Sequence, residues 1–139
     1  MVQDDEITRN LTLLEYYKEQ LTTLDVQQQY LQAALFDYQK AKMTVENLDK
    51  HQGEQELLIP VGSGVFISAH AKDSNKVLVD VGANIVVEKN SNDAVVNIDK
   101  RIEQVQENQN KLMNMIQQIQ TEAEHLSVKT QEMINEQQR

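Results

Sequence analysis

Residues 95–137 read VVNIDKRIEQVQENQNKLMNMIQQIQTEAEHLSVKTQEMINEQ, and this stretch decides the fold. Mainly apolar residues recur along it at spacings that alternate between three and four, and we call these positions the seam of the helix. Such a heptad pattern is typical of a coiled coil, because residues about 3.5 apart lie along one narrow stripe of a helix. A single helix resting on a globular core would carry a wider apolar stripe. The seam consists of Val95, Ile98, Ile102, Val105, Gln109, Leu112, Ile116, Ile119, Ala123, Leu126, Thr130, Met133 and Gln137.

A second long helix is predicted over residues 4–51. Its start is acidic and its end is basic, as the helix dipole favours, and Gly53 follows as a candidate left-handed cap. Its seam contains two consecutive three-residue steps, Lys18 to Leu21 to Leu24, which predicts a stammer in the supercoil. This seam consists of Ile7, Leu11, Leu14, Lys18, Leu21, Leu24, Gln28, Leu31, Leu35, Tyr38, Lys42 and Val45.

The two helices are expected to pair as an antiparallel hairpin. Each has about 45 residues, or roughly 65 to 70 Å, and asparagines and serine at 90–92 supply N-cap chemistry for the second, predicted over 92–137. If Leu48 lies near Val95, paired positions have numbers that sum to about 143. Lys18 would then reach Glu122 and Glu124.

The middle of the chain, residues 54–89, has a different period. All four glycines and the one proline lie between Gly53 and Gly82, and they separate four short runs rich in β-branched residues, 55–60, 64–69, 76–81 and 84–88. These runs are expected to form two β-hairpins. About 36 residues cannot cover two apolar faces, so the strands should join those of other chains. The residues expected at this interface are Leu57, Ile59, Val65, Ile67, Val77, Val79, Val81, Ile85 and Val87.

Composition excludes several functions. With 13 Lys and Arg against 22 Asp and Glu, the net charge is −9, which disfavours nucleic acid and anionic membranes as partners. No apolar run is long enough to span a membrane, and the acidic first residues do not resemble a signal peptide. The absence of cysteine removes thiol chemistry and thiolate metal sites. We therefore expect a soluble, cytoplasmic protein.

Candidate reaction centres are weak. His51, His70 and His125 lie in different elements without a second ligand at metal-binding spacing. Gly62-Ser63-Gly64 lacks the ending of a phosphate-binding loop and is better explained as a tight turn. We predict no enzyme activity, no catalytic residue, no metal and no cofactor.

The segments LLIPVGSGVFI at 57–67 and KVLVDVGANIVVEK at 76–89, between two coils of matching length, resemble the alpha class of the prefoldin family in its archaeal form. The resemblance covers the whole chain as one subunit, 1–139. It implies a mainly helical α+β fold in which a long antiparallel coiled-coil hairpin carries two central β-hairpins. It also implies that these hairpins join an oligomeric β-barrel of two alpha and four beta subunits. The implied function is an ATP-independent chaperone that passes unfolded proteins to a group II chaperonin.

The alternative to a chaperone is a passive coiled-coil scaffold or adaptor. The two differ in the tip surface, where the start of one helix meets the end of the other and apolar residues lack a full seam partner. Exposed apolar groups there would suit sequence-tolerant contacts with unfolded clients. The residues expected to bind clients at the tip are Val2, Ile7, Leu11, Leu126, Val128, Met133 and Ile134.

Overall fold

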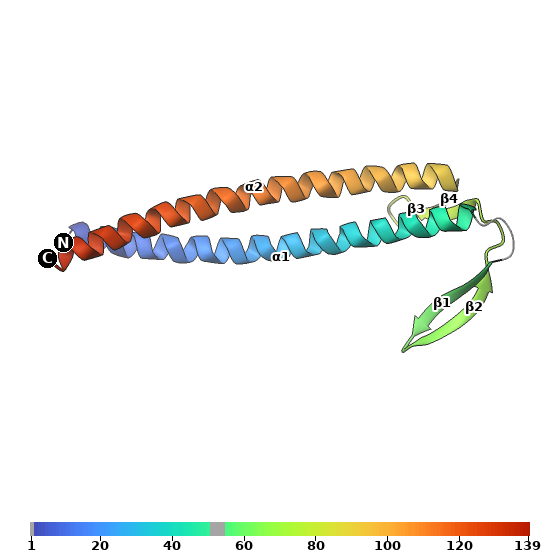
Figure 1. The fold of residues 1–139 in the computed structure, drawn as a ribbon, viewed down its shortest axis with the longest axis horizontal. Helices are drawn as coiled ribbons and strands as arrows, with labels where there is room; N and C mark the ends of the chain where they lie inside the picture. Colours follow the sequence, from blue (N-terminus) through green and yellow to red (C-terminus); the bar gives the residue numbers. More distant parts are fainter. Residues whose placement is uncertain (1, 51–54) are drawn as a thin grey trace. The chain divides into compact units, whose positions relative to one another are not determined.

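The computed structural model describes residues 2–50 and 55–139 (Figure 1). The chain is mainly helical, with two long helices and two small antiparallel β-hairpins between them, which confirms the predicted fold class. The helix end predicted at His51, the cap at Gly53 and the hairpin region's start at residue 54 lie outside the described residues. In chain order the elements are α1 (Val2–Lys50), β1 (Glu56–Gly62), β2 (Val65–His70), β3 (Lys76–Asp80), β4 (Val86–Asn90) and α2 (Ser91–Gln137).

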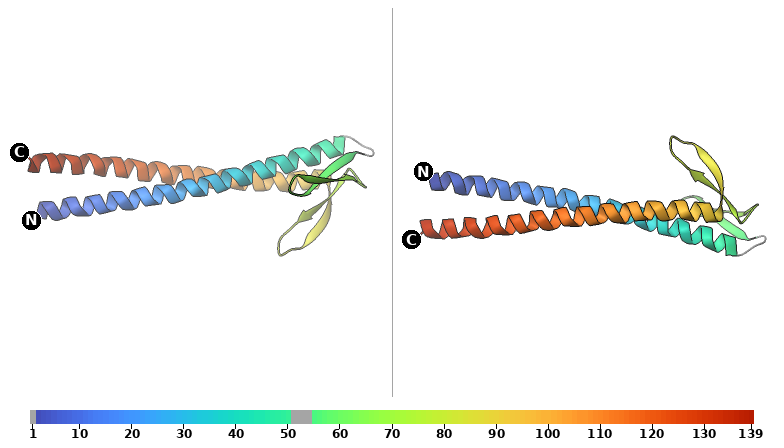
Figure 2. Two further views of the ribbon diagram at one scale, coloured as in Figure 1. Left: turned by 90° about the horizontal axis from the view of Figure 1, so that it is seen from below. Right: turned by 90° about the horizontal axis from the view of Figure 1, so that it is seen from above.

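The chain divides into two compact units. Unit 1 contains residues 1–34 and 105–139, and unit 2 contains residues 35–104. In unit 1 the start of α1, in blue, runs antiparallel to the end of α2, in red (Figure 2). Unit 2 contains the end of α1, both hairpins and the start of α2.

The seam of α1 differs from the predicted one. Leu11 and Lys18 are exposed, whereas Asn10 and Tyr17 are partly buried. With these two residues in place the spacings alternate three and four without a break from Ile7 onward, so the predicted stammer is wrong. The prediction took Leu11 because it is aliphatic and Lys18 because it follows Leu14 by four residues, whereas the seam holds an amide and a phenol that bond to the facing helix. The partly or fully buried seam positions of α1 are Ile7, Asn10, Leu14, Tyr17, Leu21, Leu24, Gln28, Leu31, Leu35, Tyr38, Lys42 and Val45.

The register within unit 1 also differs from the predicted one. The numbers of three hydrogen-bonded pairs sum to 143, 139 and 137, which averages about 140 rather than 143. The predicted approach of Lys18 to Glu122 and Glu124 is wrong, because among the described residues Lys18 forms no ion pair with either, and Glu122 accepts a hydrogen bond from Tyr17. The pairs are Asn10 Nδ2 to Met133 Sδ at 3.9 Å, Tyr17 Oη to Glu122 Oε2 at 3.2 Å, and Gln28 Nε2 to the Gln109 carbonyl at 3.5 Å.

A polar layer interrupts the apolar seam of unit 1. Gln28 donates to the carbonyl of Gln109, whose own side-chain amide donates to Gln32 Oε1 at 3.1 Å. An amide in a coiled-coil seam favours the one alignment in which its hydrogen bonds are made. This layer therefore helps to select the observed register over a slipped one.

The seam of α2 agrees with the prediction at every position except Gln137, which is exposed. Leu112 and Thr130 are its buried members in unit 1. The Thr130 hydroxyl donates to the carbonyl of Leu126 at 2.6 Å, so a polar side chain occupies the seam without an unsatisfied group.

Leu112→Ala is expected to lower the free energy of unfolding by about 2 to 4 kcal/mol. Leu112 is only 7% exposed, and truncating a buried leucine removes its contacts and leaves a void. Denaturant unfolding followed by circular dichroism would measure the loss. Met113→Ala is the control, because the neighbouring Met113 is exposed and should change stability little. Equal losses in the two variants would contradict the observed seam.

The first hairpin of unit 2 pairs β1 with β2 in antiparallel register, Ile59 opposite Ile67 and Pro60 opposite Phe66. The register shifts between Pro60 and Gly62, so Val61 forms a bulge. Strand β1 consequently runs through Gly62, two residues beyond the predicted end, and the turn is made around Ser63, which has a positive φ of 48°.

The second hairpin pairs β3 with β4 and leads directly into α2. The turn extends further than predicted, because both Ala83 and Asn84 have positive φ and β4 begins only at Val86. At the other end of β4, Asn90 caps the helix, its Oδ1 accepting from the Asp93 N–H at 2.8 Å. The predicted N-cap chemistry is thus confirmed.

Two further contacts join the hairpin and helices of unit 2. The guanidinium of Arg101 donates to the carbonyl of Asp80 at 3.2 Å, tying α2 to the end of β3. Lys42 Nζ lies 2.8 Å from Asp99 Oδ1, which raises the pKa of the ammonium through the hydrogen bond to that carboxylate. The ion pair links α1 with α2 inside this unit.

Candidate functional site: the hairpin and tip surfaces

Apolar side chains are exposed on both faces of the β1–β2 hairpin. Ile59 and Ile67 are opposite each other and share one face, and Leu58 and Phe66 lie on the other. Leu58 is 65% exposed and Ile67 is 55% exposed. Of the predicted interface residues in this hairpin, only Leu57 is partly buried, while Ile59, Val65 and Ile67 are exposed.

The β3–β4 hairpin has one half-buried face and one exposed face. The predicted residues Val77, Val79 and Val87 are half-buried within the single chain. Leu78, which is 73% exposed, and Val86 lie on the opposite face. The remaining predicted residues, Val81 and Ile85, are exposed beside the turn, where the N–H of Val81 donates to the carbonyl of Ile85 at 2.9 Å.

The prediction missed Leu58, Phe66, Leu78 and Val86 as candidate interface residues. These four residues have even numbers, whereas all the predicted interface residues have odd numbers. Because successive side chains of a strand point to opposite faces, each of the four lies on the other face of its strand. The signal was present, because each run is apolar at consecutive positions around its centre. The single chain therefore exposes more apolar hairpin surface than the prediction assigned.

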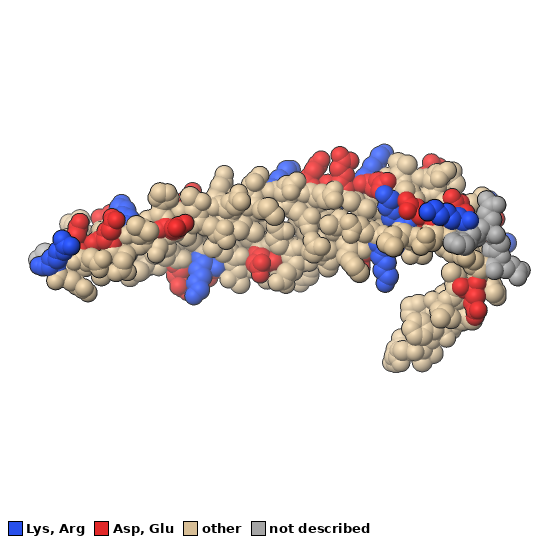
Figure 3. Space-filling view, viewed as in Figure 1, with Lys and Arg blue, Asp and Glu red and all other residues tan. Residues whose placement is uncertain are grey.

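Charge is almost absent from the β1–β2 hairpin, which is tan in Figure 3 apart from one acidic side chain near its base. That residue is Glu56, whose Oε1 accepts from the hydroxyl of Ser68 at 2.6 Å. A two-stranded hairpin with exposed apolar faces and little charge is not stable by itself in water. Its faces and edges therefore form a surface suited to pairing with other strands.

Three of the predicted tip residues are exposed and the other four are partly buried. Val2 is 85% exposed, and Leu11 and Val128 are more than half exposed. The half-buried tip residues are Ile7, Leu126, Met133 and Ile134. Leu13, which is not among the predicted tip residues, is also exposed on this part of α1.

Polar contacts hold the two helix ends of the tip together. Gln137 Nε2 donates to Asp4 Oδ1 at 2.6 Å, and Lys129 Nζ lies 3.7 Å from Glu6 Oε1. Asn10 and Met133 form a third contact one turn further in. These contacts join the start of α1 to the end of α2, so the exposed apolar side chains lie on two paired helix ends.

The phenol of Tyr17 has a perturbed environment in unit 1. Partial removal from water raises its pKa above the ordinary value of 10.0, and the hydrogen bond to the Glu122 carboxylate raises it further. Because the folded-state pKa is raised, the contact stabilises the fold fully below pH 10 and is lost as pH rises through the folded-state pKa.

In an absorbance titration at 295 nm, the difference between the wild-type protein and Tyr17→Phe is expected to have its midpoint above pH 10. Glu122→Gln removes the negative charge but can still accept a hydrogen bond, so it should move that midpoint down. A difference curve with its midpoint at or below pH 10 in the wild-type protein would contradict the contact.

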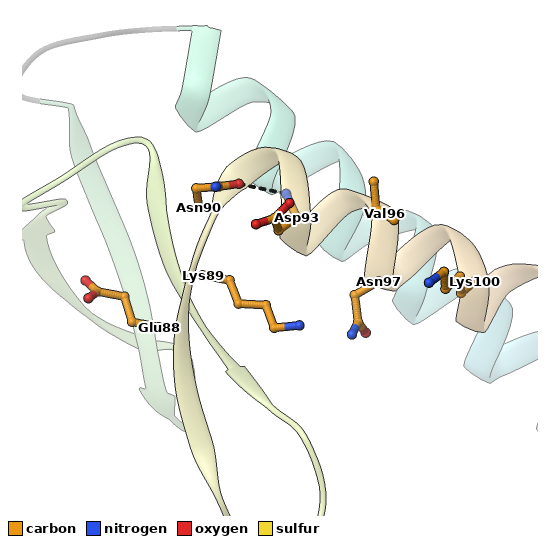
Figure 4. A pocket seen from close by; sticks show the side chains of 7 residues that line it. All are labelled: Glu88, Lys89, Asn90, Asp93, Val96, Asn97 and Lys100. Carbon is orange, nitrogen blue, oxygen red and sulfur yellow. Dashed lines mark hydrogen bonds between the residues drawn. The ribbon is translucent and has the colours of Figure 1, made fainter.

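The junction of β4 and α2 contains an open cavity of about 450 Å³ (Figure 4). Lys89 and Lys100 lie on its sides together with Glu88 and Asp93, and none of the lining side chains is buried. Such a mixed, solvated surface has no built ligand set. Within residues 2–50 and 55–139, no group of three or more histidine and carboxylate side chains could hold a metal ion.

Two long helices with a heptad seam, and two β-hairpins between them with exposed apolar side chains, define a class of protein, the coiled-coil hairpin with a β-stranded region between its helices. A family model for prefoldin subunits matches residues 17–136. The chain therefore belongs to the prefoldin family, a chaperone family, and the resemblance found in the sequence is confirmed.

Relatives and solved structures agree with this assignment. The chain is 30% identical to prefoldin subunit alpha of Archaeoglobus fulgidus over 126 residues, which cover 91% of this chain and 92% of the relative. It is 27% identical to prefoldin subunit alpha of Methanococcus aeolicus over 131 residues, 94% of this chain and 89% of the relative.

The fold is similar to that of a chain in filamentous PFD from Methanocaldococcus jannaschii, with a TM-score of 0.72, 24% identity and coverage of 84% and 97%. It is also similar to the prefoldin beta subunit from Thermococcus strain KS-1, with a TM-score of 0.60, 18% identity and coverage of 91% and 90%. No helix among the described residues is long and apolar enough to cross a membrane.

Proposed function

We propose that this chain is the alpha-class subunit of a prefoldin particle that holds unfolded proteins without ATP and delivers them to a group II chaperonin. The observation that carries the proposal is the tip surface, where Val2, Leu11 and Val128 are exposed on paired helix ends. A folded protein that leaves apolar side chains in water at such a place has a surface suited to binding.

In this proposal residues 54–89 assemble the particle and the helices bind clients. The apolar faces of both hairpins support assembly with beta subunits, because pairing would cover Leu58, Ile67 and Leu78 and their neighbours. Two alpha and four beta subunits would join their strands in a double β-barrel. That ratio is the one that the sequence resemblance to the alpha class of the family implies.

Each apolar contact between a tip and a client would be weak, but the contacts of several side chains and several tips together would give tight binding. Each apolar side chain that a client covers contributes about 1.5 to 3 kcal/mol, and several tips can engage one unfolded chain. No nucleotide is needed, since release requires only that the chaperonin compete for the same apolar segments. Three or four small exposed side chains per tip suit clients of many sequences.

The test is whether the particle, assembled with a beta-class partner, prevents aggregation of several unrelated denatured proteins without ATP. Light scattering would follow aggregation, and added group II chaperonin should then capture the held clients. A passive scaffold would leave aggregation unchanged for all of them. Mass measurement of the chain alone and with the partner would test assembly, and long filaments of the chain alone would contradict the hexamer.

A further inference from the structure

A continuous groove runs along one flank of unit 1. On α1 its residues follow the spacing of one helical stripe, so their side chains lie in a row. Three depressions make up the groove, with volumes of about 480, 300 and 330 Å³. The first two share Tyr16 and the last two share Met115, which joins them end to end. The α1 stripe consists of Leu13, Tyr16, Gln20, Thr23, Gln27 and Tyr30.

The middle depression combines an apolar base with one negative charge. Leu24, Met115 and Ile119 supply the apolar surface, and Glu19 is the single charged residue that lines it. Tyr16, three residues before Glu19 on the helix, lines the same depression, and its hydroxyl accepts from Gln20 Nε2 at 2.8 Å. A lysine or arginine side chain matches this arrangement, because its stem is apolar and its head is cationic.

The two end depressions have the opposite character. Arg9 lines one beside Leu13, and Lys111 lines the other beside Leu31 and Leu112. A cation seated at either end would meet a like charge, so apolar residues fit there better. The charge order along the groove is therefore positive, negative, positive over an apolar base.

We propose that this groove seats an extended segment of an unfolded client that carries lysine or arginine at its centre and apolar residues on both sides. The inference rests on the proposed function and names the substrate class within it. Unit 1 carries eleven acidic and five basic side chains, a balance of −6, so its wider field also attracts a cationic segment. Neutral apolar segments would bind less well.

The groove's length sets the length of the segment. Leu13 and Tyr30 are 17 residues apart on α1, or about 25 Å at 1.5 Å per residue. An extended chain advances about 3.3 Å per residue, so about eight residues span this distance. Glu19 lies 6 residues from Leu13 and 11 from Tyr30, or about 9 and 17 Å along the helix, so the client's cation falls about three residues from one end of the segment and about five from the other.

The test uses two fluorescent nine-residue peptides that differ only at the central position, which is lysine in one and glutamate in the other, with leucine and phenylalanine on both sides. Affinity is measured by fluorescence anisotropy on the particle assembled with the same beta-class partner throughout. The wild-type particle is expected to prefer the lysine peptide by about tenfold at low salt, and less at high salt.

Glu19→Lys should reverse the preference, and Glu19→Gln should abolish it without reversing it. Glu124→Lys is the matched control, because it changes the net charge equally and lines none of the three depressions. It should keep the preference for lysine. Equal effects of Glu19→Lys and Glu124→Lys, or no preference in the wild-type particle, would overturn the proposal.

Failure of this proposal is distinct from failure of the chaperone function. Suppression of aggregation by the wild-type particle is measured in parallel with unrelated denatured proteins. If it persists while the peptides show no charge preference, clients are held elsewhere, at the tips. If it is absent, the proposed chaperone function itself is wrong.

Discussion

Ile67→Asp is expected to abolish assembly of the particle while the helices stay folded. Ile67 is exposed in the single chain, so aspartate can be accommodated there before assembly. In the assembled barrel the same side chain would be an unpaired buried charge, which costs about 3 to 5 kcal/mol at each site. Gel filtration should show separate subunits or aggregate in place of the hexamer, and circular dichroism should show the helical signal largely unchanged.

Ser63→Asp is the control for this experiment. Ser63 lies in the turn of the same hairpin with a left-handed φ, a conformation that aspartate tolerates, and it is exposed. The variant adds the same charge to the same hairpin outside its paired strands, and it should assemble normally. An intact hexamer from Ile67→Asp would contradict the proposal that the hairpin faces build the shared barrel.

Replacing Val2, Leu11 and Val128 together by serine is expected to reduce client capture by about tenfold or more. All three side chains are exposed, so the fold should lose little stability. Each one that a client covers contributes about 1.5 to 3 kcal/mol to binding, and the triple variant removes all three contributions from each alpha tip. The measurement is the particle concentration that halves the aggregation of a denatured protein.

A matched triple variant separates tip binding from general loss of apolar surface. Val26, Phe36 and Val96 are also exposed but lie outside the tip, and their replacement by serine should leave client capture unchanged. The beta-class tips should be trimmed in both particles, since they could mask the loss. If the tip variant still protected clients as well as the control, the tips would not be the binding surface.

The seams show how far sequence can predict the coiled coil and where it fails. In α2 ten of the thirteen predicted seam positions are apolar and their spacing is unbroken, so spacing alone identified the seam. In α1 the true positions include Asn10 and Tyr17, while the aliphatic Leu11 lies next to the first of them and is exposed. Hydrophobicity therefore favoured Leu11, one residue away from the true seam position. Asn10 and Tyr17 form hydrogen bonds with Met133 and Glu122 on the other helix, and such contacts cannot be recognised from the local sequence of α1.

The hairpins were predictable in number but not in orientation. Turn residues and β-branched runs gave four strands, as observed. Which face of each strand is covered depends on what packs against it, and alternating apolar residues on both faces do not specify this. Hence Val79 and Leu78 are neighbours in sequence, yet only Val79 is half-buried in the single chain. The position of the tip was predictable from the antiparallel pairing of two helices of equal length, but the exposure of its side chains was not, since only Val2, Leu11 and Val128 of the seven predicted residues are exposed.

The absence of any residue between β4 and α2 gives unit 2 a mechanical property. Strand β4 ends at Asn90 and the helix begins at Ser91, which is buried and whose N–H donates to the carbonyl of Asn75 at 2.8 Å. The last residue of the strand is also the cap of the helix. Because no flexible loop separates the two elements, a rotation of this hairpin also rotates the first turn of α2. The pairing of β3 with β4 therefore also sets the direction in which α2 leaves the hairpin.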